Sequence, residues 1–135
     1  MTRAVLIGIA VLAATSAFAD PPASIPDAGR ERIEKSFQKF ASDWMARAHA
    51  LEAKQRENPT VRPGTDKPVF TYRGYADDYE VELRPTGQPR APYVGLLRYT
   101  EQVYTCPKAS ADGCEIASSV PVTEIFRYQD GRWTY

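Results

Sequence analysis

The stretch from Ile33 to Leu51 (IEKSFQKFASDWMARAHAL) carries apolar residues at steps of three and four. That spacing places them along one side of an α-helix. These residues are Ile33, Phe37, Phe40, Trp44, Met45, Ala48 and Leu51. The helix is expected to begin near Ser24-Ile25-Pro26-Asp27, which resembles a capping box, and to end at Asn58-Pro59. A helix with one apolar side needs a second layer of structure to cover that side.

From Val69 onward the apolar residues recur every second position, which is typical of β-strands. Two segments rich in Pro and Gly, 60–68 and 85–92, are expected to be loops, and Asp130-Gly131 is a tight-turn sequence. The expected strands are Val69–Tyr75, Tyr79–Arg84, Tyr93–Cys106, Cys114–Gln129 and Arg132–Tyr135. The sequence therefore predicts an α+β fold, with one long N-terminal helix packed on a curved antiparallel sheet of four to five strands.

Length and charge limit the class of protein. The chain has 135 residues, with 17 Lys and Arg against 17 Asp and Glu. That length is enough for one domain. Proteins that bind nucleic acid normally carry a basic excess, and this chain carries none. We therefore do not expect a nucleic-acid partner.

The first 19 residues are typical of a secretory signal peptide. Arg3 precedes an apolar run, and Ala17 and Ala19 are the small residues that signal peptidase requires. The apolar run is too short to span a membrane, because spanning takes about 20 residues. We expect cleavage after Ala19, a single mature domain at 20–135 without a transmembrane segment, and a periplasmic or secreted location.

Export changes what the two cysteines imply. Cys106 and Cys114 enclose seven residues, and thiol pairs in an oxidising compartment usually form disulfides. A zinc site would need two further ligands, and the chain has only one histidine. A catalytic redox pair is not indicated either, because the spacing is not C-x-x-C. The pair predicts a structural disulfide across a hairpin.

The C-terminal residues Thr123–Tyr135 (TEIFRYQDGRWTY) comprise an apolar strand, a glycine turn and a tryptophan. This ending resembles the last hairpin of NTF2-like proteins, and the order of elements resembles the cystatin-like and NTF2-like group of folds. The resemblance implies a curved sheet that wraps a helix. Typical NTF2-like domains have further N-terminal helices, however, and Gln102-Val103-Tyr104-Thr105 lacks the glycine of the cystatin inhibitory pattern Gln-x-Val-x-Gly. The resemblance therefore implies architecture and no activity.

The chain contains eight tyrosines, and their number suggests a role in binding or in packing. All lie in or beside expected strands, and tyrosine suits both a protein core and a contact surface. Since the helix already supplies aromatic residues to one sheet face, we expect tyrosines on the other face to be exposed beside arginines, as in a protein-binding hot spot. Cross-strand stacking that only stiffens the sheet is the alternative. The candidate binding residues are Tyr72, Arg73, Arg90, Tyr93, Arg98, Tyr99, Tyr104 and Arg127.

Two other groups could carry chemistry. His49 is the only histidine and the best candidate for a general base. Glu52 is expected to reach it only along the helix surface, and Asp43 is expected on a different face of the helix. The acidic group Asp77, Asp78, Glu80 and Glu82 could hold a cation or a basic partner. A helix-flank histidine and a solvated acidic face are the plainer interpretations.

These observations favour a non-catalytic exported protein that acts by protein–protein contact, such as an inhibitor or immunity protein against an envelope-targeting toxin or enzyme. We expect no metal and no cofactor, and a homodimer is a further candidate. The alternative is an NTF2-like pocket protein that binds a small apolar ligand, or an enzyme that uses His49 or Asp43. An envelope scaffold is a third hypothesis.

Overall fold

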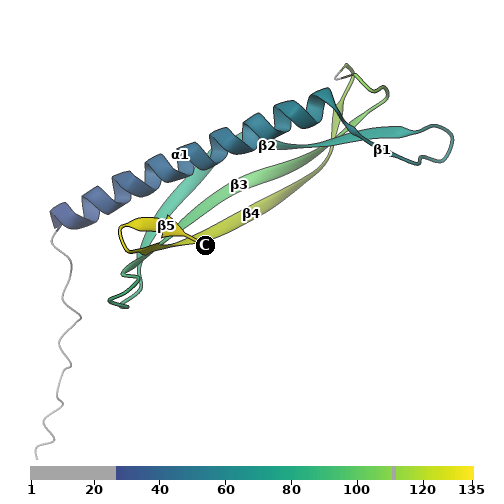
Figure 1. Cartoon of the computed structure of the whole chain (residues 1–135). Coiled ribbons are helices and arrows are strands. Elements are labelled where there is room, and N and C mark those ends of the chain that lie inside the picture. The colour runs from purple at the N-terminus through teal and green to yellow at the C-terminus, as the bar shows by residue number, and fades with distance from the viewer. Residues whose placement is uncertain (1–26, 111) are drawn as a thin grey trace, which may run out of the picture.

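The computed structural model describes residues 27–110 and 112–135. Its elements are α1 (Asp27–Glu57), β1 (Thr60–Arg62), β2 (Val69–Pro85), β3 (Tyr93–Cys106), β4 (Glu115–Gln129) and β5 (Arg132–Thr134). The strands form one antiparallel sheet in chain order, and α1 runs along the length of this strongly twisted sheet (Figure 1). The α+β prediction is confirmed. The predicted signal peptide and helix cap lie outside the described residues.

Two parts of the sheet differ from the sequence-based expectation. β2 is one long strand, because the backbone stays in the sheet through a bulge in which residues 76–78 lie opposite Thr100 alone. The chain was expected to break there, but this segment has no Pro or Gly. In addition, Thr60–Arg62 was expected to be a loop and instead pairs with residues 69–71 as the short strand β1.

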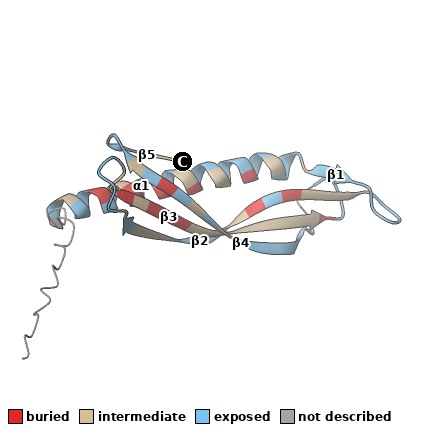
Figure 2. Ribbon diagram, turned by 90° about the horizontal axis from the view of Figure 1, so that it is seen from below, coloured by how far each residue is buried: buried red, intermediate tan, exposed pale blue. Residues whose placement is uncertain are grey.

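The hydrophobic core lies between the N-terminal half of α1 and one face of the sheet (Figure 2). Phe37 and Phe126 are fully buried. A Cβ atom at Gly95 would come within 2.4 Å of the Phe37 ring, so the close packing of helix on sheet requires glycine there. The indole Nε1 of Trp133 donates a hydrogen bond to the Ser36 hydroxyl at 3.1 Å. The buried core cluster consists of Phe37, Ala41, Met45, Leu97 and Phe126.

The hairpin that carries Trp133 onto this core turns at Asp130-Gly131, as predicted. The φ angles of the two residues are 51° and 76°. Positive φ at both central positions matches the twist of a two-residue hairpin loop, and aspartate and glycine tolerate it. The turn thereby brings the ring centroid of Trp133 to 4.6 Å from that of Phe37.

The C-terminal half of α1 does not continue the apolar contact. Leu51 is 48% exposed although it belongs to the predicted stripe, whereas Glu52 is only 7% exposed. The reason is that this half of the helix lies along the edge of β2, where backbone N–H groups need acceptors, instead of over an apolar sheet face. Gln55 Oε1 accepts a hydrogen bond from the Arg73 N–H at 3.1 Å, and Glu52 Oε2 accepts one from the Tyr75 N–H at 3.2 Å.

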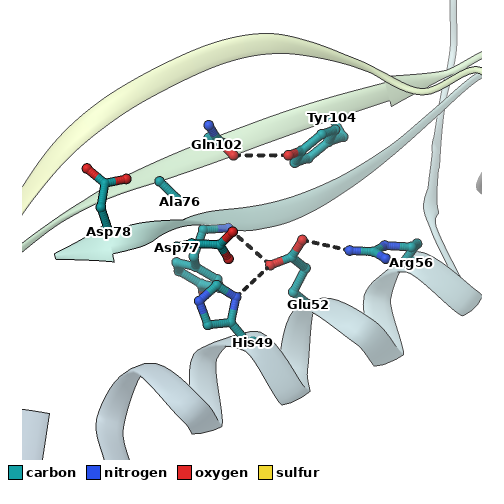
Figure 3. Close-up of a pocket in the computed structure, with 9 residues that line it drawn as sticks. His49, Glu52, Arg56, Ala76, Asp77, Asp78, Gln102 and Tyr104 are labelled. Atoms are coloured by element: carbon teal, nitrogen blue, oxygen red, sulfur yellow. Dashed lines mark hydrogen bonds and ion pairs between the residues drawn. The ribbon is translucent and has the colours of Figure 1, made fainter. Parts of the chain in front are cut away.

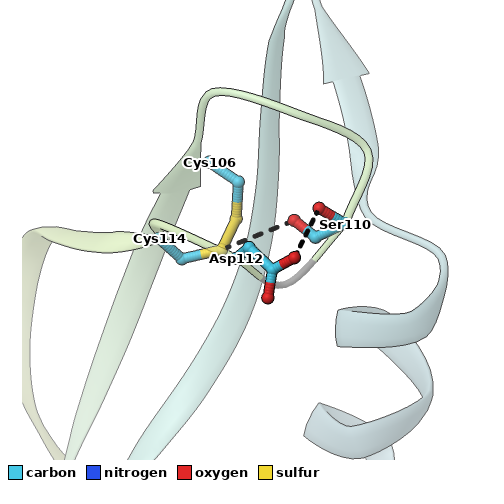
Figure 4. The surroundings of a disulfide bond; sticks show 4 residues. All are labelled: Cys106, Ser110, Asp112 and Cys114. Atoms are coloured by element: carbon cyan, nitrogen blue, oxygen red, sulfur yellow. Dashed lines mark hydrogen bonds between the residues drawn. A yellow bond between two sulfur atoms is a disulfide. The ribbon is translucent and has the colours of Figure 1, made fainter.

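A disulfide joins Cys106, at the end of β3, to Cys114, which directly precedes β4 (Figure 4). It closes the β3–β4 hairpin, as predicted. None of the described residues forms a helix with the length and hydropathy that a membrane span needs.

Loss of this disulfide is expected to lower the free energy of unfolding by about 2.5 kcal/mol, because a cross-link over so short a loop removes that much chain entropy from the unfolded state. Urea denaturation of the protein with and without reductant measures the difference. A variant with serine at both cysteines provides the control, because reductant should not change its stability. Equal stability of oxidised and reduced wild-type protein would contradict the prediction.

Candidate functional site

A pocket of about 510 Å³ opens between the C-terminal half of α1 and the bulge of β2 (Figure 3). Most of its walls are polar or charged. The lining residues are His49, Glu52, Arg56, Tyr75, Ala76, Asp77, Asp78, Gln102 and Tyr104. Such a lining does not suit the small apolar ligand considered from the sequence, because burying charged groups against apolar atoms leaves them without partners.

Glu52 is the buried centre of this pocket. Its Oε2 atom lies 3.2 Å from Nδ1 of His49 and accepts the Tyr75 N–H, while Oε1 accepts a hydrogen bond from Arg56 Nη2 at 2.9 Å. Gly74 makes room for the carboxylate, because a Cβ there would lie 3.0 Å from Glu52 Oε1 and 2.6 Å from the Tyr104 ring. The hydrogen bond from the Tyr75 N–H joins the helix to β2, whereas the contacts with His49 and Arg56 lie within α1.

Glu52 pairs with His49 as the sequence suggested, but it is buried instead of lying on the helix surface. Glu52 follows Ala48 by four residues and Met45 by seven, so it continues the apolar stripe. An acid in the register of a buried stripe was the signal that could have identified it, because buried acids are almost always paired. Asp43 lies on the exposed side of α1, where it pairs with Lys39.

His49 is half-buried at the mouth of the pocket, and its ring packs edge-on against Tyr75. A carboxylate at one ring nitrogen orients an imidazole as general bases require. The lining residues, however, include no serine, threonine or cysteine that such a base could activate. Among residues 27–110 and 112–135, no group of three His, Cys, Asp or Glu side chains could hold a metal ion.

A second candidate surface lies on β4. β3 flanks this strand along one side, whereas β5 pairs with it only from Arg127 to Gln129. The other edge of the strand is therefore open over residues 115–126 within the described structure. Every residue from Glu115 to Pro121 is exposed (Figure 2). The exposed fractions of Ile116, Val120 and Ile125 are 50%, 53% and 55%.

The tyrosine-rich face is not the exposed surface that the sequence suggested. Tyr72 and Tyr93 are 8% and 5% exposed. Tyr104 stacks on Tyr72, with ring centroids 4.7 Å apart and ring planes 4° apart, and both face the helix end. Tyr99 packs against the core, and burial, followed by the nearby Glu124 carboxylate, raises the pKa of its hydroxyl to about 12. These contacts favour the alternative interpretation, in which the tyrosines stack across strands and stiffen the sheet.

The side of β3 that faces the helix changes along the strand. This change is the reason why the predicted exposure of the tyrosines was wrong. Leu97 and Tyr99 pack towards the core, whereas Gln102 and Tyr104 border the pocket beside Glu52. The change occurs at the level of the β2 bulge. With strict alternation along β3, Gln102 and Tyr104 would lie on the opposite side of the sheet from Leu97 and Tyr99. The helix thus covers tyrosines in both halves of the sheet.

The candidate arginines remain accessible, unlike the tyrosines. Arg73, Arg90 and Arg127 are exposed, and Arg98 is half-buried. Arg73 pairs with Glu101 at 3.2 Å. Arg98 lies on the sheet face away from the core, where Nη2 contacts Glu82 at 2.7 Å and Arg84 contacts the other carboxylate oxygen. The predicted binding residues therefore separate into covered aromatic rings and accessible cations.

The two arginines beside Glu82 hold the pKa of its carboxyl at about 2, below its ordinary value of 4.5, chiefly through hydrogen bonds from Arg84 and then from Arg98. Because the folded-state pKa is lowered, the ionised contact stabilises the fold above about pH 4.5, and this contribution is lost as pH falls through about 2. An NMR titration of the Glu82 carboxyl should give this midpoint.

Replacement of either arginine by alanine should raise that midpoint towards 4.5, because each removes a hydrogen bond to the ionised form. Arg90→Ala is the matched control, since Arg90 is exposed on the loop between β2 and β3 and is not one of the arginines that lower the pKa of Glu82. An unchanged midpoint in Arg84→Ala and Arg98→Ala would count against the network.

Comparison with protein-family models, curated proteins and solved structures finds no match to this chain. The cystatin-like and NTF2-like resemblance therefore stays a prediction. The fold and the two candidate sites rest on the geometry described above.

Proposed function

We propose that this protein is a non-catalytic exported binding protein that acts in the periplasm by protein–protein contact. An inhibitor or immunity protein that occludes an envelope-targeting enzyme or toxin is the concrete form of the proposal. The observation that carries it is the open edge of β4, where Ile116, Val120 and Ile125 are each about half exposed. Exposed aliphatic groups on a strand with an open edge are characteristic of contact surfaces.

The rest of the molecule agrees with this role. The disulfide locks the hairpin from which β4 starts, so the strand is held rigidly at that end. On the opposite side of the sheet, β1 covers the start of β2, and Gln55 and Glu52 accept hydrogen bonds from the Arg73 and Tyr75 N–H groups. A rigid surface with an open edge is suited to binding because little conformational entropy is lost on association.

Site-specific cross-linking tests the proposal. A photo-activated cross-linking residue at Val120 is expected to capture one defined protein from envelope extracts of the source organism. The same residue at Ala46, which is exposed on α1, should not capture it. The captured protein should bind the wild-type chain and its His49→Ala variant equally in purified form. Absence of a specific partner at Val120 would argue against the proposal.

One observation favours a second candidate, namely a pocket protein or an enzyme centred on His49. Its imidazole lies 3.2 Å from a buried carboxylate at the mouth of a pocket. The ligand would be polar, given the charged lining. Turnover of any substrate by the purified protein, abolished in His49→Ala, would favour this candidate over the first.

A further inference from the structure

We infer that the open edge of β4 receives an extended segment of another protein as an added strand, and that this segment carries β-branched residues between two basic ones. The inference rests on the proposed function and specifies how its surface works. Strand addition gains affinity from backbone hydrogen bonds and specificity from alternate side chains. The open edge over residues 115–126 is long enough for both.

The composition of this edge makes it accessible to another strand. Natural edge strands are usually protected by lysines, prolines, bulges or a covering element. Here no charged residue occurs between Glu115 and Glu124. Pro121 removes one N–H donor, and the single register shift against β3 lies near Ala117. The rest of the edge is uncharged, and several of its residues are β-branched.

The covered edge on the other side of the sheet provides the internal comparison. There β1 pairs with the start of β2, and beyond it Gln55 and Glu52 accept the N–H groups of Arg73 and Tyr75. The molecule thus uses a buried carboxylate to satisfy one edge and leaves the other edge without such acceptors among its described residues. Beyond Tyr75 no strand pairs with the outer edge of β2 in the described structure, but that stretch has five charged residues from Asp77 to Arg84, and such charges protect an edge strand. The β4 edge, in contrast, combines a long open stretch with an uncharged sequence.

The charges on β4 define the complementary segment. Glu115 is exposed at one end of the open edge, and Glu124 lies near the other. Opposite charges directly across two antiparallel strands stabilise the pair, and like charges destabilise it. A complementary segment therefore has a lysine or arginine near each end. Between them, β-branched residues pair well with Ile116, Val120 and Val122.

A second copy of the chain fits this edge less well. A two-fold antiparallel pairing over 115–126 centres between Val120 and Pro121, which brings the prolines of both copies next to the axis. Both strands would then lack donors at the same place. The second copy would also bring two more glutamates and no cation within the paired stretch. A foreign segment has neither disadvantage.

The test uses a ten-residue peptide with alternating Val and Thr between two terminal lysines. We expect it to bind the purified protein and to slow amide hydrogen exchange in β4 between Ile116 and Thr123. A peptide with glutamate at both ends should bind about tenfold more weakly. N-methylation of alternate peptide amides should abolish binding for the set that faces β4 and leave it nearly intact for the other set, because only one set donates to the edge.

Charge exchange provides the matched control. In Glu115→Lys, the glutamate-ended peptide should bind more tightly and the lysine-ended peptide more weakly. Glu57→Lys, at the exposed end of α1, makes the same charge change away from β4 and should alter neither affinity. These exposed substitutions are not expected to affect folding, which circular dichroism can verify.

Three results would overturn the inference. The first is that neither peptide binds, or that binding leaves exchange in β4 unchanged. The second is equal binding of both N-methylated peptides. The third is concentration-dependent protection of β4 without peptide, together with a dimer in sedimentation, which would make a second copy the occupant. The proposed function would survive the first two results if Val120 still captured a partner, so the two failures are distinguishable.

Discussion

Phe126→Ala is expected to lower the free energy of unfolding by about 3–5 kcal/mol, which is the usual cost of removing a buried phenylalanine ring. Phe126 is 0% exposed. Its ring centroid lies 4.8 Å from that of Phe40, 5.1 Å from Trp44 and 4.8 Å from Tyr135. Since small domains are typically stable by about 5–15 kcal/mol, the variant should approach the limit of folding. Urea denaturation measures the loss through the transition midpoint at constant slope.

Ile125→Ala is the matched control, because Ile125 is the preceding residue of β4 and lies on the opposite face. It is mostly exposed, so the expected loss is less than about 1 kcal/mol. A cost for Ile125→Ala similar to that for Phe126→Ala would mean that β4 presents its faces differently from the structure. The pair of variants thus tests the strand orientation on which the exposed β4 surface depends.

Features of the fold that depend on neighbouring residues could be predicted from the sequence, and features that depend on distant residues could not. The steps of three and four in 33–51 and the change to a period of two after Val69 depend only on neighbouring residues, so helix, hairpins and disulfide were predictable. The bulge at residues 76–78 was not, because Ala-Asp-Asp carries no strong local signal. That bulge accompanies the change in which side of β3 faces the helix, and the exposure of the tyrosines therefore could not follow from alternation alone.

The candidate sites illustrate the same limit. Tyr72 and Tyr104 were identified as binding residues because of their type, but the helix covers them. Edge strands, in contrast, cannot be identified from composition, because the order of strands in the sheet decides which edge is open. Once that order is known, the uncharged stretch between Glu115 and Glu124 can be recognised as an open edge that is accessible to another strand. The sequence predicted the residues of β4, and the topology showed that over residues 115–126 only β3 pairs with them.

Glu52→Ala is expected to lower the free energy of unfolding by about 2–3 kcal/mol. The contacts that are lost should lie only in the C-terminal half of α1 and at the edge of β2. The Tyr75 N–H would lose its acceptor, and Arg56 and His49 would lose their shared partner. Leaving a buried donor unsatisfied costs about 1–3 kcal/mol by itself. Glu52→Gln retains an acceptor without the charge, so its cost should be intermediate. Urea denaturation gives these differences.

Amide hydrogen exchange then shows whether the loss arises at the strand edge. In Glu52→Ala the Tyr75 amide should lose protection, whereas the Arg73 amide should retain it because Gln55 is still its acceptor. Asp43→Ala is the control on the same helix, since this exposed acid pairs with Lys39 in an i,i+4 contact worth less than about 0.5 kcal/mol. Equal costs for the two alanine variants, or a protected Tyr75 amide in Glu52→Ala, would show that the carboxylate does not close this edge. The contrast with the open β4 edge would then have no physical basis.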